Sequence, residues 1–268
     1  MSHVNIYSGG IGQLDCLFDD RSNDSYIGRD SYMKNVYKYI SESKDQFTQE
    51  NFYKNFRNAD EKIIVPVCAM GLGFWIMTFQ DALRLNAQKF QDQKLKLIAE
   101  KHRNEDSGHD LWYLHDLDAL RINPPDLYML YSPDLAFVRD SAFEVMGEIM
   151  KSDDDYTRLA IIETIEAVSE VFFYHMATYT SSKANGFKLL YFSRHHYEAE
   201  MSHSDRDIEA AFMNNTVSYE KRRQIIETVD RILDSFRAVL EGLNDMVMHQ
   251  EQPRPLELAS PYVLANCG

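Results

Sequence analysis

Histidine and acidic residues are concentrated in the segment RHHYEAEMSH, residues 194–203 of a chain of 268 residues. This segment holds three of the nine histidines, interleaved with two glutamates. On a helix, His196, Glu200 and His203 follow one another at i, i+4 and i+7, so they share one face. Burying one carboxylate and two imidazoles without partners is costly, and a divalent metal ion can satisfy all three groups together. The competing interpretation is a solvated helix face on which His196 and Glu200 form a surface pair.

A second segment, HRNEDSGHD, carries a related pair. Asp106 and His109 are spaced i, i+3, and Glu105 and His109 are spaced i, i+4, so either acid shares a helix face with the histidine. An acidic residue followed three positions later by histidine is the device with which helical bundles bind two irons. Glu200 and His203 repeat this spacing. The chain therefore offers two acid–histidine pairs on different predicted helices, with Glu105 and Asp106 as alternative ligands in the first pair.

A third predicted helix, IIETIEAVSEVFFYH, supplies more carboxylates. Glu166 and Glu170 lie on it at i, i+4. Three carboxylates and three histidines from three helices match a non-haem di-iron site, which needs oxygen donors for Fe(III), imidazoles for Fe(II) and open positions for O2. The competing interpretation is that Glu163, Glu166 and Glu170 form an ordinary solvated acidic face.

Helical periodicity covers most of the chain, and the sequence contains no convincing strand, so the fold class that it predicts is all-α. Residues 90–120 keep a period near 3.6 until Asn123-Pro124-Pro125 stops it, and 218–248 form one strongly amphipathic helix. We expect helices over 31–57 (two short ones), 60–88, 90–120, 133–149, 155–180, 189–203 and 218–248.

Length and composition indicate a single domain with a sizeable core, since 44% of the residues are apolar. Residues 1–30 are rich in Gly, Ser, Asp and Asn and are expected to form an irregular arm. The helical domain is expected over 31–250. Residues 251–268 contain three prolines and are expected to form an extended tail.

The formal net charge of −14, without a Lys/Arg cluster to offset it, argues against nucleic acid and anionic lipid surfaces as partners. The three cysteines stand far apart in no metal-ligand spacing, as expected for reduced thiols in a cytoplasmic protein. The N-terminus lacks the pattern of a signal peptide. Residues 63–79 are 17 residues without a charge, at the lower limit for a membrane span. They contain Pro66 and two glycines and continue into a helical pattern, so we expect a buried core helix and no membrane association.

NEDSGHDLWYL, IEAVSEVFF and RHHYEAEMSH, at these separations, resemble the haem-oxygenase-like di-iron oxidases and oxygenases, also grouped as iron-containing redox enzymes. By motif the resemblance covers roughly residues 95–210, and by helical character the remainder. The resemblance implies a haem-oxygenase-like bundle of about seven helices without haem, with two irons per chain, Fe(II) or Fe(III), between core helices. The metal ligands that it implies are Glu105 or Asp106, His109, Glu166, His196, Glu200 and His203.

Three further points belong to this ligand set. The family usually has Glu in the first motif and commonly Asp in the last, whereas this chain has Asp106 and Glu200. Glu170 is the alternative to Glu166. His102 lies one turn back on the ligand face. We expect it to be a core histidine rather than an additional ligand.

The activity that the resemblance implies is reductive activation of O2 through a peroxo-di-iron species. The oxidised substrate would be a small molecule of the amino-acid or fatty-acid class. The reaction would be N-oxygenation, C–H abstraction or desaturation, or C–C cleavage. No catalytic group is expected beyond the metal ligands. An external electron donor and a homodimer are both compatible with the sequence. The alternative is a non-redox or interaction protein of the same helical fold that binds no stoichiometric iron.

Overall fold

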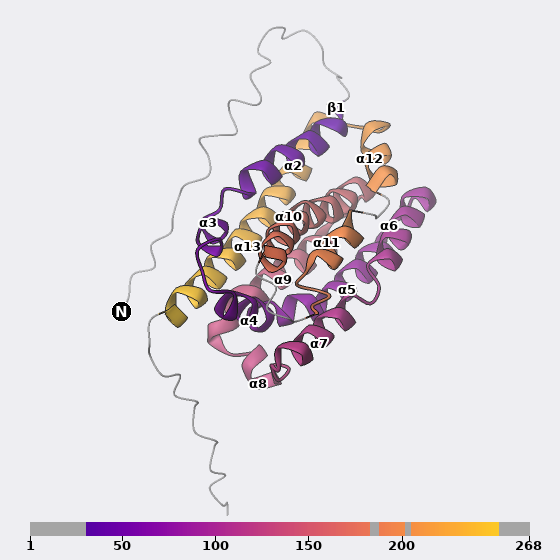
Figure 1. Ribbon diagram of the computed structural model, residues 1–268. Coiled ribbons are helices and arrows are strands. Elements are labelled where there is room, and N and C mark those ends of the chain that lie inside the picture. The colour runs from indigo at the N-terminus through magenta and orange to yellow at the C-terminus, as the bar shows by residue number, and fades with distance from the viewer. Residues whose placement is uncertain (1–30, 183–187, 202–204, 252–268) are drawn as a thin grey trace, which may run out of the picture.

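The computed structural model describes residues 31–182, 188–201 and 205–251, and this part of the chain forms a helical bundle (Figure 1). The predicted all-α class is therefore confirmed. The predicted arm, the tail beyond Glu251 and the predicted ligand His203 lie outside the described residues. In chain order the elements are β1 (Ser31–Tyr32), α2 (Lys34–Phe47), α3 (Asn51–Phe56), α4 (Glu61–Gly71), α5 (Gly73–Lys89), α6 (Gln93–Glu105), α7 (His109–Leu120), α8 (Leu127–Leu130), the 3-10 helix η1 (Pro133–Leu135), α9 (Ala136–Lys151), α10 (Asp155–Ser182), α11 (Arg194–Glu200), α12 (Asp205–Met213), β2 (Thr216–Val217) and α13 (Tyr219–Glu251).

Helix α10 lies in the middle of the bundle and packs against α2, α9, α11 and α13 (Figure 1). It is apolar on several faces, with Leu159, Ile161, Ile165 and Val168 all buried, as expected for a helix surrounded by others. The long helix α13 instead buries one stripe, which packs on α4, α9 and α10. The predicted helices 155–180 and 218–248 are confirmed within a few residues.

The predicted helix over 60–88 is wrong in one respect, because α4 and α5 form two helices bent by 46° around Leu72. Two glycines flank the bend because neighbouring helices approach there. A Cβ at Gly71 would lie 2.5 Å from Leu243 Cδ2, and one at Gly73 would lie 2.6 Å from the Tyr113 hydroxyl. Such separations are far inside van der Waals contact, so a residue larger than glycine would not fit at either position without moving its neighbours.

Among the described residues, no single helix is long and apolar enough to cross a membrane. The bent pair Ile63–Gly71 and Gly73–Lys89 has the length and apolar composition of a membrane span only when the two helices are taken together. Ile64, Val65 and Val67 of this apolar run are buried in the core, as predicted.

The predicted helix over 90–120 is also interrupted, because α6 ends at Glu105 and α7 begins at His109. Gly108 has a φ of 98°, in the left-handed region that is costly for residues with a Cβ. The apolar period continues across this turn, which is why the pattern looked continuous.

The segment 189–193 is not helical either, since α11 begins only at Arg194. Ser193 ends the preceding turn and caps α11, its hydroxyl accepting a hydrogen bond from the His195 backbone N–H. A further small departure is the antiparallel pair β1–β2, which joins Ser31 to Val217 and Tyr32 to Thr216. The number of helices exceeds the seven expected because these turns divide long patterns and because α3, α8 and α12 are short.

Candidate metal centre

Six acidic and histidine side chains form two groups whose ligand atoms converge. The first cluster consists of His102 and Asp106, at the end of α6, and Glu166 of α10. The second cluster consists of His109, at the start of α7, with His196 and Glu200 of α11. Within each cluster the candidate ligand atoms lie within 4.8 Å of one another. Four helices therefore meet at one site, and each cluster joins residues from distant parts of the sequence.

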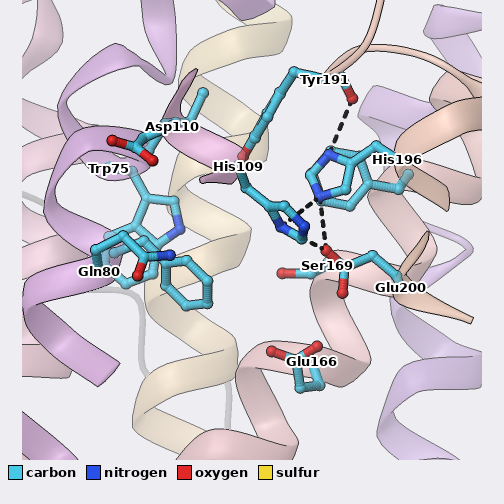
Figure 2. A pocket seen from close by; sticks show the side chains of 12 residues that line it. Trp75, Gln80, His109, Asp110, Glu166, Ser169, Tyr191, His196 and Glu200 are labelled. Atoms are coloured by element: carbon cyan, nitrogen blue, oxygen red, sulfur yellow. Dashed lines mark hydrogen bonds and ion pairs between the residues drawn. The ribbon is translucent and has the colours of Figure 1, made fainter. Parts of the chain in front are cut away.

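The second cluster is the tighter of the two. Glu200 Oε1 lies 2.6 Å from His196 Nε2 and 3.2 Å from His109 Nδ1. The two imidazole nitrogens lie 3.1 Å apart. Figure 2 shows His109, His196 and Glu200 pointing toward one another. Three atoms that can each donate a lone pair therefore surround one point.

The tautomer of His196 follows from its other nitrogen. His196 Nδ1 lies 3.0 Å from the backbone carbonyl oxygen of Tyr191. Because a carbonyl only accepts, Nδ1 is assigned the proton of the neutral ring and Nε2 the lone pair. Burial lowers the pKa of His196, although the Glu200 carboxylate acts in the opposite direction. A lone pair facing a carboxylate oxygen is repulsive unless a cation lies between them, and a metal ion is a cation that suits these donors.

His102 occupies a comparable position in the first cluster. Its Nδ1 lies 3.3 Å from Asp106 Oδ2 and its Nε2 lies 3.2 Å from Glu166 Oε1. Both nitrogens are buried, and neither makes a well-aligned hydrogen bond to a described residue. A neutral imidazole has one N–H, so it cannot donate to both carboxylates. The buried ring between two acids again favours a bound cation.

Asp106 connects the two clusters. Its Oδ2 faces His102 at 3.3 Å, and its Oδ1 lies 3.6 Å from His109 Nδ1. The side chain is 1% exposed. Asp106 holds this place as the C-cap residue that follows the last residue of α6, immediately before the turn at Gly108. Gln80 of α5 fixes the turn by donating from Nε2 to the Asp106 carbonyl oxygen at 2.7 Å. A carboxylate with one oxygen toward each cluster has the placement required to bridge two metal ions.

Asp116 of α7 holds the segment that carries the Tyr191 carbonyl. Its carboxylate is fully buried and accepts hydrogen bonds from the backbone N–H groups of Leu190, at 2.7 Å, and Phe192, at 2.8 Å. Through this segment Asp116 sets the position of the His196 ring, and nothing in the residue types predicts this contact.

We expect Asp116→Asn to lower the free energy of unfolding by about 1–3 kcal/mol, because the carboxamide oxygen cannot replace both acceptors. Urea denaturation measures the change. Asp118→Asn, an exposed site on the same helix, is the control and should stay within about 0.5 kcal/mol of the parent. Equal stability of the two variants would show that Asp116 does not anchor the segment.

Aromatic rings enclose the histidines. Trp112 stacks on His109 with centroids 4.4 Å apart, and Phe173 lies 3.8 Å from the His196 ring. Tyr191 also packs on His196, at 4.5 Å. Trp112 and Phe173 thus lie directly against the candidate ligands. Such rings lower the local dielectric and strengthen electrostatic interactions at the site.

A cavity of about 440 Å³, its mouth included, opens beside the second cluster. Figure 2 shows Glu166 and Ser169 of α10 facing the same space as His196 and Glu200, with Gln80 and Asp110 across it. The residues that line it are Trp75, Ile76, Phe79, Gln80, His109, Asp110, Glu166, Ser169, Phe173, Tyr191, His196 and Glu200.

The alternatives left open by the sequence separate in space. Asp106 belongs to the first cluster, whereas Glu105 is half-buried and belongs to neither cluster of described residues. Glu166 belongs to the first cluster, whereas Glu170 forms an ion pair with Lys44 Nζ at 2.6 Å. His102, which we expected to be a core histidine, lies among the candidate ligands.

Two further acidic and histidine side chains lie away from the clusters. Glu198 points to solvent and pairs with Arg194 at 2.9 Å. His175 stacks on Tyr53 in the core, and burial lowers its pKa to about 4. Gln80 and Asp116 support the site but were not anticipated, because each acts through a contact between distant segments.

No protein-family model and no curated protein matches the chain. Among solved structures, the structure of this chain is similar to that of a TenA homolog from Pseudomonas syringae pv. tomato. The TM-score is 0.52, with 14% sequence identity over 78% of this chain and 91% of that chain. Likeness at this identity shows the fold, which is the all-helical TenA fold and similar to haem-oxygenase-like bundles. The predicted haem-oxygenase-like bundle is therefore confirmed, and the predicted chemistry stays a proposal.

Proposed function

We propose that the chain is a non-haem di-iron oxidoreductase that uses O2 to oxidise a small substrate. The observation that carries this proposal is the Asp106 carboxylate between two clusters, each with at least one histidine and one further carboxylate. A mononuclear metal site would need only one of these clusters. The resemblance of the motifs to di-iron oxidases supports the same assignment.

The donor set fits iron. The described residues offer three imidazoles and three carboxylates, a mixture of nitrogen and oxygen donors that suits Fe(II) and Fe(III). His102, Asp106 and Glu166 would hold one ion, and His109, His196 and Glu200 the other. When bound, two irons supply the redox chemistry that side chains lack, namely the reductive activation of O2.

The remaining residues orient and shield this site. The Tyr191 carbonyl keeps the His196 proton on Nδ1 and leaves Nε2 available as a donor. Trp112 and Phe173 cover the imidazoles and exclude water. The cavity beside Glu200 gives a small substrate access to the same space. Under this proposal the electrons for O2 come from an external donor, which is then a partner of the protein.

The test is anaerobic titration of the metal-free protein with Fe(II), followed by addition of O2. We expect close to two irons per chain. The second should bind more weakly, because the charge of the first lies only one carboxylate away from it. Elemental analysis gives the iron content, and the optical spectrum after O2 addition reports the reaction.

His249→Ala is a suitable control, since His249 is an exposed histidine of α13, far along the chain from both clusters. This variant should bind the same amount of iron as the parent. Saturation well below one iron per chain, or equal preference for haem, would contradict the proposal. The first of these results is what a non-redox or interaction protein of the same fold would give.

A further inference from the structure

A second, apolar cavity adjoins the metal-binding clusters. It encloses about 500 Å³ of space between atoms, its open mouth included. It shares five lining residues with the cavity at the clusters, which are Trp75, Ile76, Ser169, Phe173 and Tyr191. The two cavities are therefore neighbours on either side of these side chains.

The described residues that line this second cavity include no acid, no lysine, no arginine and no histidine. Apart from the Trp75 indole, the polar side chains are the hydroxyls of Tyr53, Ser169 and Tyr191. A carboxylate or an ammonium group placed here would lose its hydration without gaining an opposite charge. The lining therefore suits an uncharged, mainly apolar molecule.

Tyr53 is the unusual member of this lining. It is 0% exposed, and its hydroxyl has no hydrogen-bond partner among the described residues. Buried tyrosine hydroxyls normally have a partner, because leaving the group unpaired costs free energy. The ring is held by His175, stacked at 4.4 Å, and by an edge contact with Phe52 at 5.5 Å. Burial raises the pKa of Tyr53 well above its usual value, so the hydroxyl stays protonated and can donate.

We infer that this cavity binds the apolar body of an uncharged substrate and that the Tyr53 hydroxyl donates a hydrogen bond to an acceptor oxygen on it. The acceptor is a neutral group such as a ketone, ester or amide carbonyl. Tyr53 lines the apolar cavity and not the cavity at the clusters, so the part of the molecule that extends past Ser169 and Phe173 is the part that reaches the clusters. The inference rests on the proposed function in taking those clusters as the reacting centre, and it narrows the substrate to molecules whose end in this cavity is uncharged and carries an acceptor oxygen.

The test is isothermal titration calorimetry of the metal-free full chain with three probes of equal length, 2-octanone, octanoate and octylamine. We expect 2-octanone to bind most tightly. Tyr53→Phe should weaken its binding about three- to tenfold, the loss of one hydrogen bond. Because no metal is present, this result is independent of whether the protein binds iron.

Tyr113→Phe is the matched control. Tyr113 is equally buried, but its hydroxyl donates to the Ala69 carbonyl oxygen at 2.8 Å. Without ligand, Tyr53→Phe should raise the melting temperature, since it removes an unpaired polar group, whereas Tyr113→Phe should lower it. Tyr113→Phe should leave the affinity for 2-octanone within about twofold, because it removes no contact to the probe.

Three binding results would overturn the inference. The first is that octanoate or octylamine binds more tightly than 2-octanone. The second is that Tyr53→Phe binds 2-octanone as tightly as the parent does. The third is that none of the three probes binds to the parent. A fall in melting temperature for Tyr53→Phe equal to that for Tyr113→Phe would also overturn it, because it would show that the Tyr53 hydroxyl is already satisfied within the folded chain.

Discussion

The Asp106→Asn variant is expected to fall from about two irons per chain to less than one while keeping its helical content. The carboxylate faces His102 with one oxygen and His109 with the other, so the substitution removes a candidate ligand atom and a negative charge that would serve the ions of both clusters. Loss of a ligand or its support typically lowers metal affinity 10- to 100-fold, and here the loss acts on both ions. Elemental analysis after anaerobic loading measures the iron, and circular dichroism measures the helices.

The neighbouring residue supplies the control. Glu105→Gln makes the same change of charge one position earlier, at a half-buried residue that belongs to neither cluster. It should still bind two irons. The helices should persist in both variants, since the bundle is stabilised mainly by its apolar faces. If Glu105→Gln lost iron and Asp106→Asn kept it, Glu105 would be the ligand and the turn after α6 would be placed wrongly.

The sequence predicts the long helices well because the information for them is local. α10 and α13 repeat an apolar residue every three or four positions over many turns, and this period alone determines which faces are buried. The predicted ends of these two helices therefore lie within a few residues of the observed ends. The all-α class needs no more than this.

The turns within long patterns were harder to predict, although residues that allow them are present. Gly71, Gly73 and Gly108 permit the bend and the turn, but a glycine inside a helical pattern is compatible with a continuous helix as well. The close approach of Leu243 and Tyr113 decides the outcome at the bend, and these residues come from distant helices. The break before His109 matters most, since it directs Asp106 between the two clusters.

The choice among candidate ligands depends on contacts that spacing does not contain. Glu166 and Glu170 lie on nearly the same face of α10, only about 40° apart. Lys44, from α2, pairs with Glu170 and leaves Glu166 beside His102. His102 was on the expected ligand face, yet only the folded chain shows a second carboxylate on its far side. Motif spacing therefore singles out the candidate residues, and tertiary contacts select which of them lie together.

Glu200 and Glu198 are the sharpest pair with which to test the second cluster. Two residues apart on a helix, they point about 200° away from each other. Glu200 Oε1 lies 2.6 Å from His196 Nε2, with 11% of the side chain exposed, whereas Glu198 pairs with Arg194 on the surface. Glu200→Gln should lower the affinity for the second iron tenfold or more and slow the absorbance change on adding O2. Glu198→Gln should change both by less than about twofold, since exposed ion pairs contribute little.

Stability of the metal-free variants separates loss of a ligand from loss of the fold. In Glu200→Gln the new amide N–H₂ can donate to the lone pair on His196 Nε2, which faces a carboxylate oxygen in the parent. We therefore expect the metal-free Glu200→Gln protein to be at least as stable as the metal-free parent, although it binds less iron. Glu200→Asp keeps the charge and should retain metal. If Glu198→Gln lost iron while Glu200→Gln kept it, α11 would present the opposite face to His109. If metal-free Glu200→Gln unfolded at a clearly lower temperature than the parent, Glu200 would instead be a structural partner of His196, and the three donors of the second cluster would not be arranged around a metal ion.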